Sequence, residues 1–192
     1  MSCFHDFTSP LWELLAGNLL LLLCSLFYLV WWVVCFRPNA AGGHSGGVFL
    51  AFAFLTGIAA VILMSNGASV LSSVSKGLPV RFIVIGAVVL YLVLLPVTAV
   101  VFHRQVTSEL LIMILWAALE LSVIDVLYGT SRFGVGRTAV AAAFVGAALV
   151  VGLICYVLYY RLDGAASYID GMIPLASDAA VMAVFLGLLA LS

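Results

Sequence analysis

Long apolar runs alternate with short polar segments along the whole chain. The runs are about 18 or more residues long, and each can cross a hydrocarbon core of roughly 30 Å as a helix. The pattern therefore predicts an all-α, polytopic membrane bundle that forms a single domain over residues 1–192. About six transmembrane helices are expected, with approximate ranges 11–36, 48–65, 80–102, 108–128, 138–160 and 172–191.

The last predicted span is the least regular, because Pro174 and Asp178 interrupt its beginning. Its uninterrupted part, residues 179–191, is short for a span. Besides a span that begins near residue 172, the alternative is that residues 164–178 form an interfacial or re-entrant piece that leads into a shorter helix. The connections between the other spans are short and rich in turn formers, as in GTSRFGVGR, and predict antiparallel packing of successive helices.

The composition agrees with a membrane location. Hydrophobic residues make up 66% of the chain and charged residues 8%, whereas a soluble domain has about a quarter charged residues. The formal net charge of −1 leaves no basic surface for nucleic acid. A bacterial cell membrane is the expected location. The Lys and Arg residues of the loops leave the orientation undecided, but Arg37 after the first span, with Asp6 and Glu13 before it, favours an amino terminus on the outside, since a cationic flank tends to stay in the cytoplasm.

Two rows of small residues predict close contacts between helices. They are spaced four residues apart, as in Ala139, Ala143 and Ala147 of the fifth span and Ala179, Ala183 and Gly187 of the sixth. Small residues let helix backbones approach in lipid, where helices associate through van der Waals contact. These faces are expected to pack inside the bundle or to dock a partner protein.

Glu120 is the most unusual residue of the predicted fourth helix. It lies within roughly 3 Å of the midpoint of the helix at a rise of about 1.5 Å per residue. Every Lys and Arg of the chain falls in a loop or at the end of a span, so no cation is expected at this depth. Burial without a cation favours the neutral carboxyl unless water or a bound cation reaches it. Glu120 is thus either a proton- or cation-binding group or a protonated packing residue.

The same predicted helix carries other polar residues besides Glu120. One stripe carries Glu109, Trp116 and Glu120, and an adjoining stripe carries Ser122, Asp125 and Tyr128. Asp125 lies about 10 Å from the centre of the helix, where the membrane interface can solvate it. The two stripes together predict a broad polar face on this helix.

The third predicted helix contains a proline at membrane depth. Pro96 has no backbone N–H and releases the carbonyl of Leu92, which can line a cavity or provide a hinge. Proline is also common in membrane helices without such a role. With the neighbours of this proline and a polar residue of the first helix, the candidate ion- or substrate-binding residues are Glu120, Asp125, Ser122, Tyr128, Tyr91, Pro96, Thr98 and Asn18.

The sequence gives little support for an enzyme active site or a cofactor-binding site. The four cysteines form no CxxC pair, and the three histidines are too scattered for a metal cage. The segment GGHSGG contains the pattern G-x-S-x-G, but it lies in a loop and not between a strand and a helix. No catalytic residue, metal or cofactor is therefore predicted.

Three functions remain open. The first is a small transporter or channel, coupled to protons or cations through the acids of the fourth helix, with the bilayer, a small solute or ion and possible copies of itself as partners. The second is a membrane subunit or substrate-capturing component of a larger complex. In size and hydropathy alone the chain is similar to the substrate-binding components of energy-coupling vitamin transporters. The third is an intramembrane lipid-modifying enzyme, for which the support is Asp163, Asp170 and Asp178 near the last loop.

Overall fold

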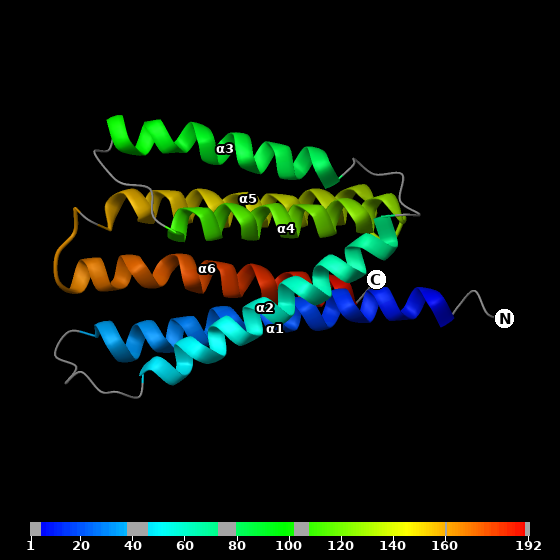
Figure 1. The fold of residues 1–192 in the computed structure, drawn as a ribbon, viewed down its shortest axis with the longest axis horizontal. Coiled ribbons are helices and arrows are strands. Elements are labelled where there is room, and N and C mark those ends of the chain that lie inside the picture. Colours follow the sequence, from blue (N-terminus) through cyan, green and yellow to red (C-terminus); the bar gives the residue numbers. More distant parts are fainter. Residues whose placement is uncertain (1–4, 38–45, 73–79, 102–107, 160, 191–192) are drawn as a thin grey trace.

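The computed structural model describes residues 5–37, 46–72, 80–101, 108–159 and 161–190, and all regular structure within them is helical. The helices run alternately up and down (Figure 1). Their bounds are α1 His5–Phe36, α2 Gly46–Ser72, α3 Val80–Val100, α4 Ser108–Gly129, α5 Val135–Leu158 and α6 Ala165–Ala190. The all-α bundle expected from the sequence is confirmed.

Five of the helices, α1, α2, α4, α5 and α6, are long and apolar enough to cross a membrane. In α3 the described apolar stretch is shorter and covers Ile85–Leu94. Large apolar side chains cover the outer surface, and Leu55 of α2, for example, is 64% exposed. A protein surrounded by water rarely exposes so much contiguous apolar surface, so the outer surface is suited to lipid.

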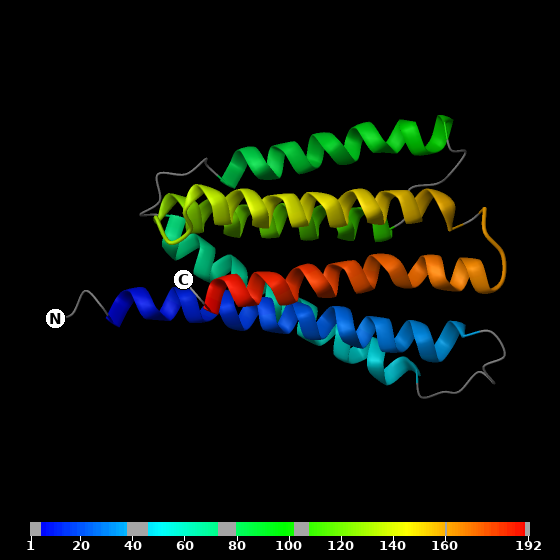
Figure 2. The ribbon, with the colours of Figure 1, turned by 180° about the vertical axis from the view of Figure 1, so that it is seen from behind.

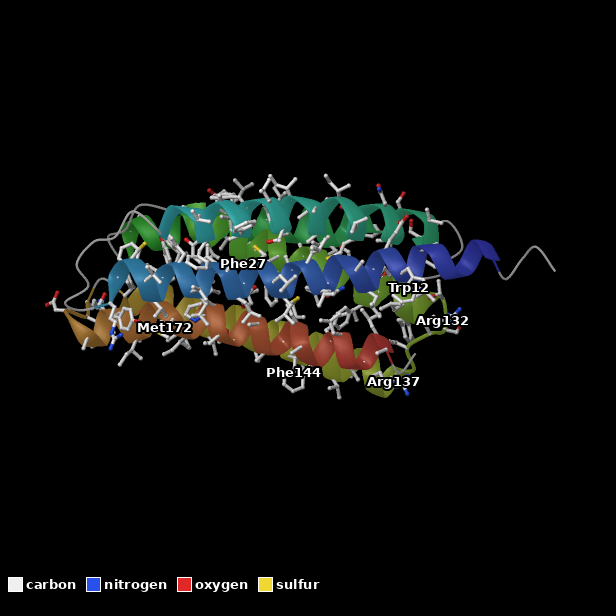
Figure 3. The ribbon with its side chains drawn as sticks, turned by 90° about the horizontal axis from the view of Figure 1, so that it is seen from below. Trp12, Phe27, Arg132, Arg137, Phe144 and Met172 are labelled. Atoms are coloured by element: carbon white, nitrogen blue, oxygen red, sulfur yellow. The ribbon has the colours of Figure 1, made fainter. Side chains whose placement is uncertain are left out.

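The helices form a layered bundle in which α1 and α2 pair at one side and α3 lies at the opposite edge (Figures 1 and 2). Between them, α6 contacts α1 and α5, and α4 contacts α5, α2 and α3. Trp12, Arg132 and Arg137 lie at one end of the bundle and Met172 lies at the other (Figure 3). We call these the Arg132 end and the Met172 end.

The contact between α1 and α2 depends on glycine. A Cβ atom on Gly67 would lie 2.8 Å from the carbonyl oxygen of Pro10, and one on Gly17 would lie 2.5 Å from Cγ of Met64. The two backbones therefore approach closely at both positions. This contact also explains why α2 continues to Ser72, beyond the expected end at residue 65, because Ala68 and Leu71 of its last turns are buried.

The sixth span begins earlier than expected and is one continuous helix. Residues 165–190 are helical through Pro174, so the re-entrant alternative for residues 164–178 is wrong. Tertiary contacts hold the first turns of α6 against α1. The indole Nε1 of Trp32 donates a hydrogen bond to the carbonyl oxygen of Tyr168 at 3.1 Å, and the Trp32 ring lies against Gly171.

The expected packing of the small-residue row on α5 is wrong. Ala139, Ala143 and Ala147 are exposed. The side of α5 that is buried instead carries Ala141, Val145, Ala148, Gly152, Cys155 and Tyr156. Small residues occur on several sides of α5, so spacing alone did not identify the side that contacts α4 and α6. On α6, Ala179 is buried, whereas Ala183 and Gly187 are exposed.

We expect Trp32→Phe to lower the stability of the bundle by about 1 kcal/mol, the net contribution of a typical hydrogen bond. The substitution removes the indole donor to Tyr168 and the six-membered indole ring that lies against Gly171, so the contribution of the hydrogen bond is a lower bound on the effect. Thermal unfolding of the purified protein in detergent measures the effect. Trp12→Phe is the matched control, because Trp12 is 67% exposed. Equal stability of the two variants would contradict this role of Trp32.

Candidate functional site

Glu120 is fully buried in the centre of the bundle. It is the thirteenth of the 22 residues of α4, and its side chain is 0% exposed. Its neighbours one turn away on α4, Ala117, Val123 and Ile124, belong to the apolar core. Within the described residues, neither carboxyl oxygen of Glu120 has a hydrogen-bond partner. This carboxyl group therefore retains its full capacity to bind a proton, a cation or a donor group.

Trp116 lies one turn before Glu120 on the same stripe of α4. Its indole Nε1 is buried and also has no hydrogen-bond partner among the described residues. An indole N–H is a donor only, whereas the carboxyl oxygens of Glu120 are acceptors. One stripe of α4 thus presents an unused donor and unused acceptors side by side.

Asp178 of α6 is a second carboxylate at the middle of the bundle. It is the fourteenth of the 26 residues of α6, and it lies one and two turns before the core residues Met182 and Phe185. Its side chain is partly buried. No described residue forms a hydrogen bond or ion pair with it. Like Glu120, it is a carboxylate without a compensating group in the described part of the chain.

The two carboxylates lie at nearly the same level along the bundle. Met113 of α4 lies beside Gly152 of α5, so Glu120, seven residues further on, is level with Val145. The Cys155 side chain of α5 contacts Asp170 of α6, so Val145 is level with residue 180. Asp178 and Glu120 are therefore within about one helical turn, ~5 Å, along the bundle axis.

Asn18 is another polar side chain buried inside the bundle. It is 0% exposed and lies one turn from the core residues Leu14 and Leu21. Its Nδ2 donates a hydrogen bond to the carbonyl oxygen of Leu14 at 3.0 Å. Its Oδ1 has no partner among the described residues, so it remains an unused acceptor inside the bundle.

The other predicted residues of α4 differ from Glu120 in their surroundings. Ser122 is buried, but its hydroxyl donates to the carbonyl oxygen of Ala118 at 2.7 Å within the helix. Asp125 is partly buried and already has an interaction partner. Tyr128 is 46% exposed. Glu120 is therefore the predicted acid of α4 with unused oxygens in the core.

The predicted residues of α3 lie away from the central carboxylates. Tyr91 is partly buried and packs against the small cluster formed by Ile114 and Tyr156. Pro96 lies inside the continuous helix α3 and is exposed. The side chain of Thr98 is outside the described part of the structure. The structure brings none of the described α3 candidates to the level and interior position of Glu120.

The arrangement is suited to reversible binding of a proton or a cation. An ionised carboxylate buried without a partner is costly by several kcal/mol, so the group gains stability when it takes up a proton or a cation. Within the described residues, no group of three or more His, Cys, Asp or Glu side chains could hold a metal ion. Because the carboxyl oxygens of Glu120 have no hydrogen-bond partner among the described residues, they can exchange a proton or a small monovalent cation, or accept hydrogen bonds from a polar solute.

The sequence pattern did not identify Asp178 as a partly buried acid at the level of Glu120. The polar residues around Pro174 suggested that the helix begins near Asp178, at the membrane surface. The spacing of Asp178, Met182 and Phe185 at i, i+4 and i+7 is the signal for an inward-facing helical stripe. It could have placed Asp178 on the buried side of a longer helix.

Comparisons with known proteins assign no family. No family model matches the chain, and neither curated proteins nor solved structures give a significant match.

Proposed function

We propose that this protein moves a proton or a small cation across the membrane, alone or together with a solute, and that Glu120 and Asp178 bind the transported charge. The observation that carries the proposal is the surroundings of Glu120, which is fully buried at the middle of a span and has two unpartnered carboxyl oxygens within the described structure. Ionisable residues inside membrane spans are costly and commonly mark pathways for ions or protons. Binding of the transported charge is a role that accounts for an ionisable carboxyl group at a position where its burial costs free energy.

Each polar group of the site has a role that its chemistry supports. Glu120 binds and releases the charge at the centre of the span. Asp178, at nearly the same level on α6, provides a second group that can bind the charge. Trp116 Nε1 is a donor that can orient the Glu120 carboxylate or a solute, and Asn18 Oδ1 is an acceptor for the same solute.

A second candidate function is that of a membrane subunit that works only in a larger complex. It is favoured by the exposed row Ala139, Ala143 and Ala147 on α5, since small residues at this spacing allow a helix of another chain to approach closely. The lipid-modifying enzyme is less favoured. It needs acids grouped near the headgroups, and Asp178 lies at the middle of α6.

The experiment that tests the proposal is flux through the purified protein in proteoliposomes with a pH-sensitive dye inside. A proton gradient, a sodium gradient and a panel of small solutes are applied in turn. Flux in liposomes that contain this protein alone supports transport. Absence of flux, together with copurification of other membrane proteins from the native source, would favour the subunit function instead.

We expect Asp178→Asn to reduce this flux strongly, because an amide of similar shape can neither bind nor release a proton and carries no charge for a cation. The matched control is Asp163→Asn, which makes the same chemical change at an exposed position in the α5–α6 connection. Initial rates of flux at equal protein content measure the difference. Unchanged flux in Asp178→Asn would remove Asp178 from the pathway.

A further inference from the structure

Asp170 is a buried acid that the central site does not include. It lies near the beginning of α6, at the Met172 end of the bundle, and is 5% exposed. The Cys155 thiol of α5 donates a hydrogen bond to its carboxylate. Its oxygen Oδ2 has no partner among the described residues. Asp170 is thus another carboxylate with an unused oxygen, eight residues or about 12 Å from Asp178 along α6.

A polar stripe connects Asp170 with the level of Asp178. Asp170, Pro174 and Ser177 are spaced at i, i+4 and i+7 and share one side of α6. Because Pro174 has no backbone N–H, the main-chain carbonyl of Asp170 lacks its usual helical donor. The Ser177 hydroxyl donates to the carbonyl oxygen of Pro174 at 2.8 Å. Oxygen atoms therefore occur in successive turns of α6 from Asp170 to Ser177, next to Asp178.

The helix beside this stripe is lined by small residues. Cys155 of α5 is at the level of Asp170, and the next buried positions along α5 toward the centre are Gly152 and Ala148. These side chains occupy little volume. Gly152 packs against the Met113 side chain of α4, so the small group of α5 that contacts the stripe itself is the Cys155 thiol, beside Asp170.

We propose that the stripe from Asp170 to Ser177 is the entry path by which a proton or a small monovalent cation reaches the central carboxylates from the Met172 end. This inference rests on the proposed function and adds the end of the bundle from which the charge enters. Asp170 receives the charge near the membrane surface, and the oxygens of α6 lead it to Asp178 and Glu120. The same oxygens bind a hydrated proton or a cation such as Na⁺, so separate gradients are needed to distinguish these two ions.

Cys155 provides a test that does not depend on flux. The variant Cys3→Ser/Cys24→Ser/Cys35→Ser keeps Cys155 as its one thiol. The matched control Cys3→Ser/Cys35→Ser/Cys155→Ser keeps Cys24, which is also inside a span and partly buried but lies between α1 and α2 beside Gly57. A small, cationic, membrane-impermeant methanethiosulfonate is added to either side of the vesicles. We expect Cys155 to react from one side, and its rate ratio for the cationic reagent over a neutral reagent of similar size to exceed that of Cys24, because this ratio does not depend on how much of each thiol is ionised. Equal ratios for the two thiols, or no reaction of Cys155, would overturn the entry path.

Removing the carboxylate tests its part in the path. In the Cys155 background, Asp170→Asn is expected to abolish the preference for the cationic reagent over a neutral reagent of similar size. In the protein with all its cysteines, Asp170→Asn is expected to lower flux under whichever gradient, proton or sodium, drives the wild type, whereas Asp163→Asn leaves that flux unchanged. Unchanged reagent preference and unchanged flux in Asp170→Asn would overturn the proposal even when Cys155 is reactive.

The two tests separate this inference from the function on which it rests. If the wild type shows no flux but Cys155 reacts from one side in an Asp170-dependent manner, the path is supported and the transport function fails. If flux depends on Glu120 but not on Asp170, and Cys155 is unreactive, the transport function stands and the path is overturned. Because the thiol assay uses a chain that retains Asp170, it remains decisive if Asp170→Asn fails to fold.

Discussion

Glu120→Gln is expected to abolish proton- or cation-coupled flux and to leave the bundle folded. Gln has nearly the shape of Glu, so it fits the buried position among Ala117, Val123 and Ile124. It is always neutral and cannot exchange a proton or balance the charge of a cation. Since both carboxyl oxygens of Glu120 lack partners within the described residues, the substitution removes no described hydrogen bond. The effect should therefore fall on transport and not on stability.

The measurement compares initial flux in proteoliposomes with thermal unfolding in detergent for the same preparations. Glu13→Gln is the matched control, because it makes the same chemical change at a partly buried position near the beginning of α1. We expect the control to keep both flux and stability. Wild-type flux in Glu120→Gln would remove the main support for the proposed function and leave Glu120 as a packing residue.

Gly67→Val is expected to destabilise the bundle more than any other substitution described above. The added Cβ would lie 2.8 Å from the carbonyl oxygen of Pro10 and 3.1 Å from Cγ of Leu14. The oxygen belongs to the backbone of α1 and cannot move by a change of rotamer, so α1 and α2 must separate. Overpacking of this kind typically costs about 1–3 kcal/mol, and it should lower the unfolding temperature in detergent.

Gly187→Val controls for the effect of placing valine in a helix. Gly187 lies in α6, and a Cβ added there meets no other side chain and no other helix within 4 Å. The two substitutions share the propensity cost of valine, so the difference between their unfolding temperatures reports the contact between α1 and α2. Equal unfolding temperatures would show that the close approach at Gly67 contributes nothing to stability.

Much of the fold followed from hydropathy. The approximate spans agree with the six helices, because an apolar run long enough to cross a bilayer must satisfy its backbone groups within itself and therefore forms a helix. The differences lie at the ends. The polar segment after residue 65 continues α2, since Gly67, Ala68 and Leu71 are buried. Residues 165–171 begin α6, since Trp32 packs against Tyr168 and Gly171. Both extensions depend on α1 being a neighbour of α2 and of α6.

Of the two acids proposed to bind the transported charge, the sequence pointed to Glu120 but not to Asp178. Glu120 stood out because it is an acid near the middle of an apolar run and no basic residue is expected at its depth. Asp178 did not stand out, because Pro174 made its surroundings resemble the end of a span. Tyr91 and Pro96 of α3 were candidates because of their chemistry. The structure places them on the outermost helix, where Tyr91 packs against Ile114 of α4 and Pro96 is exposed. The chemistry of a residue and its depth in the membrane do not reveal whether its side chain faces the interior of the bundle.

The sequence by itself determined the class of the protein, the approximate spans and the presence of an acid in the middle of the fourth helix, because these depend on the cost of placing each residue in lipid. The tertiary structure decided which side of each helix is buried, as the exposed Ala139 and the buried Ala141 of α5 illustrate. It also decided that α6 is continuous and that Asp178 is level with Glu120. These features depend on van der Waals contacts between helices far apart in the chain, and such contacts leave no local signal in hydropathy.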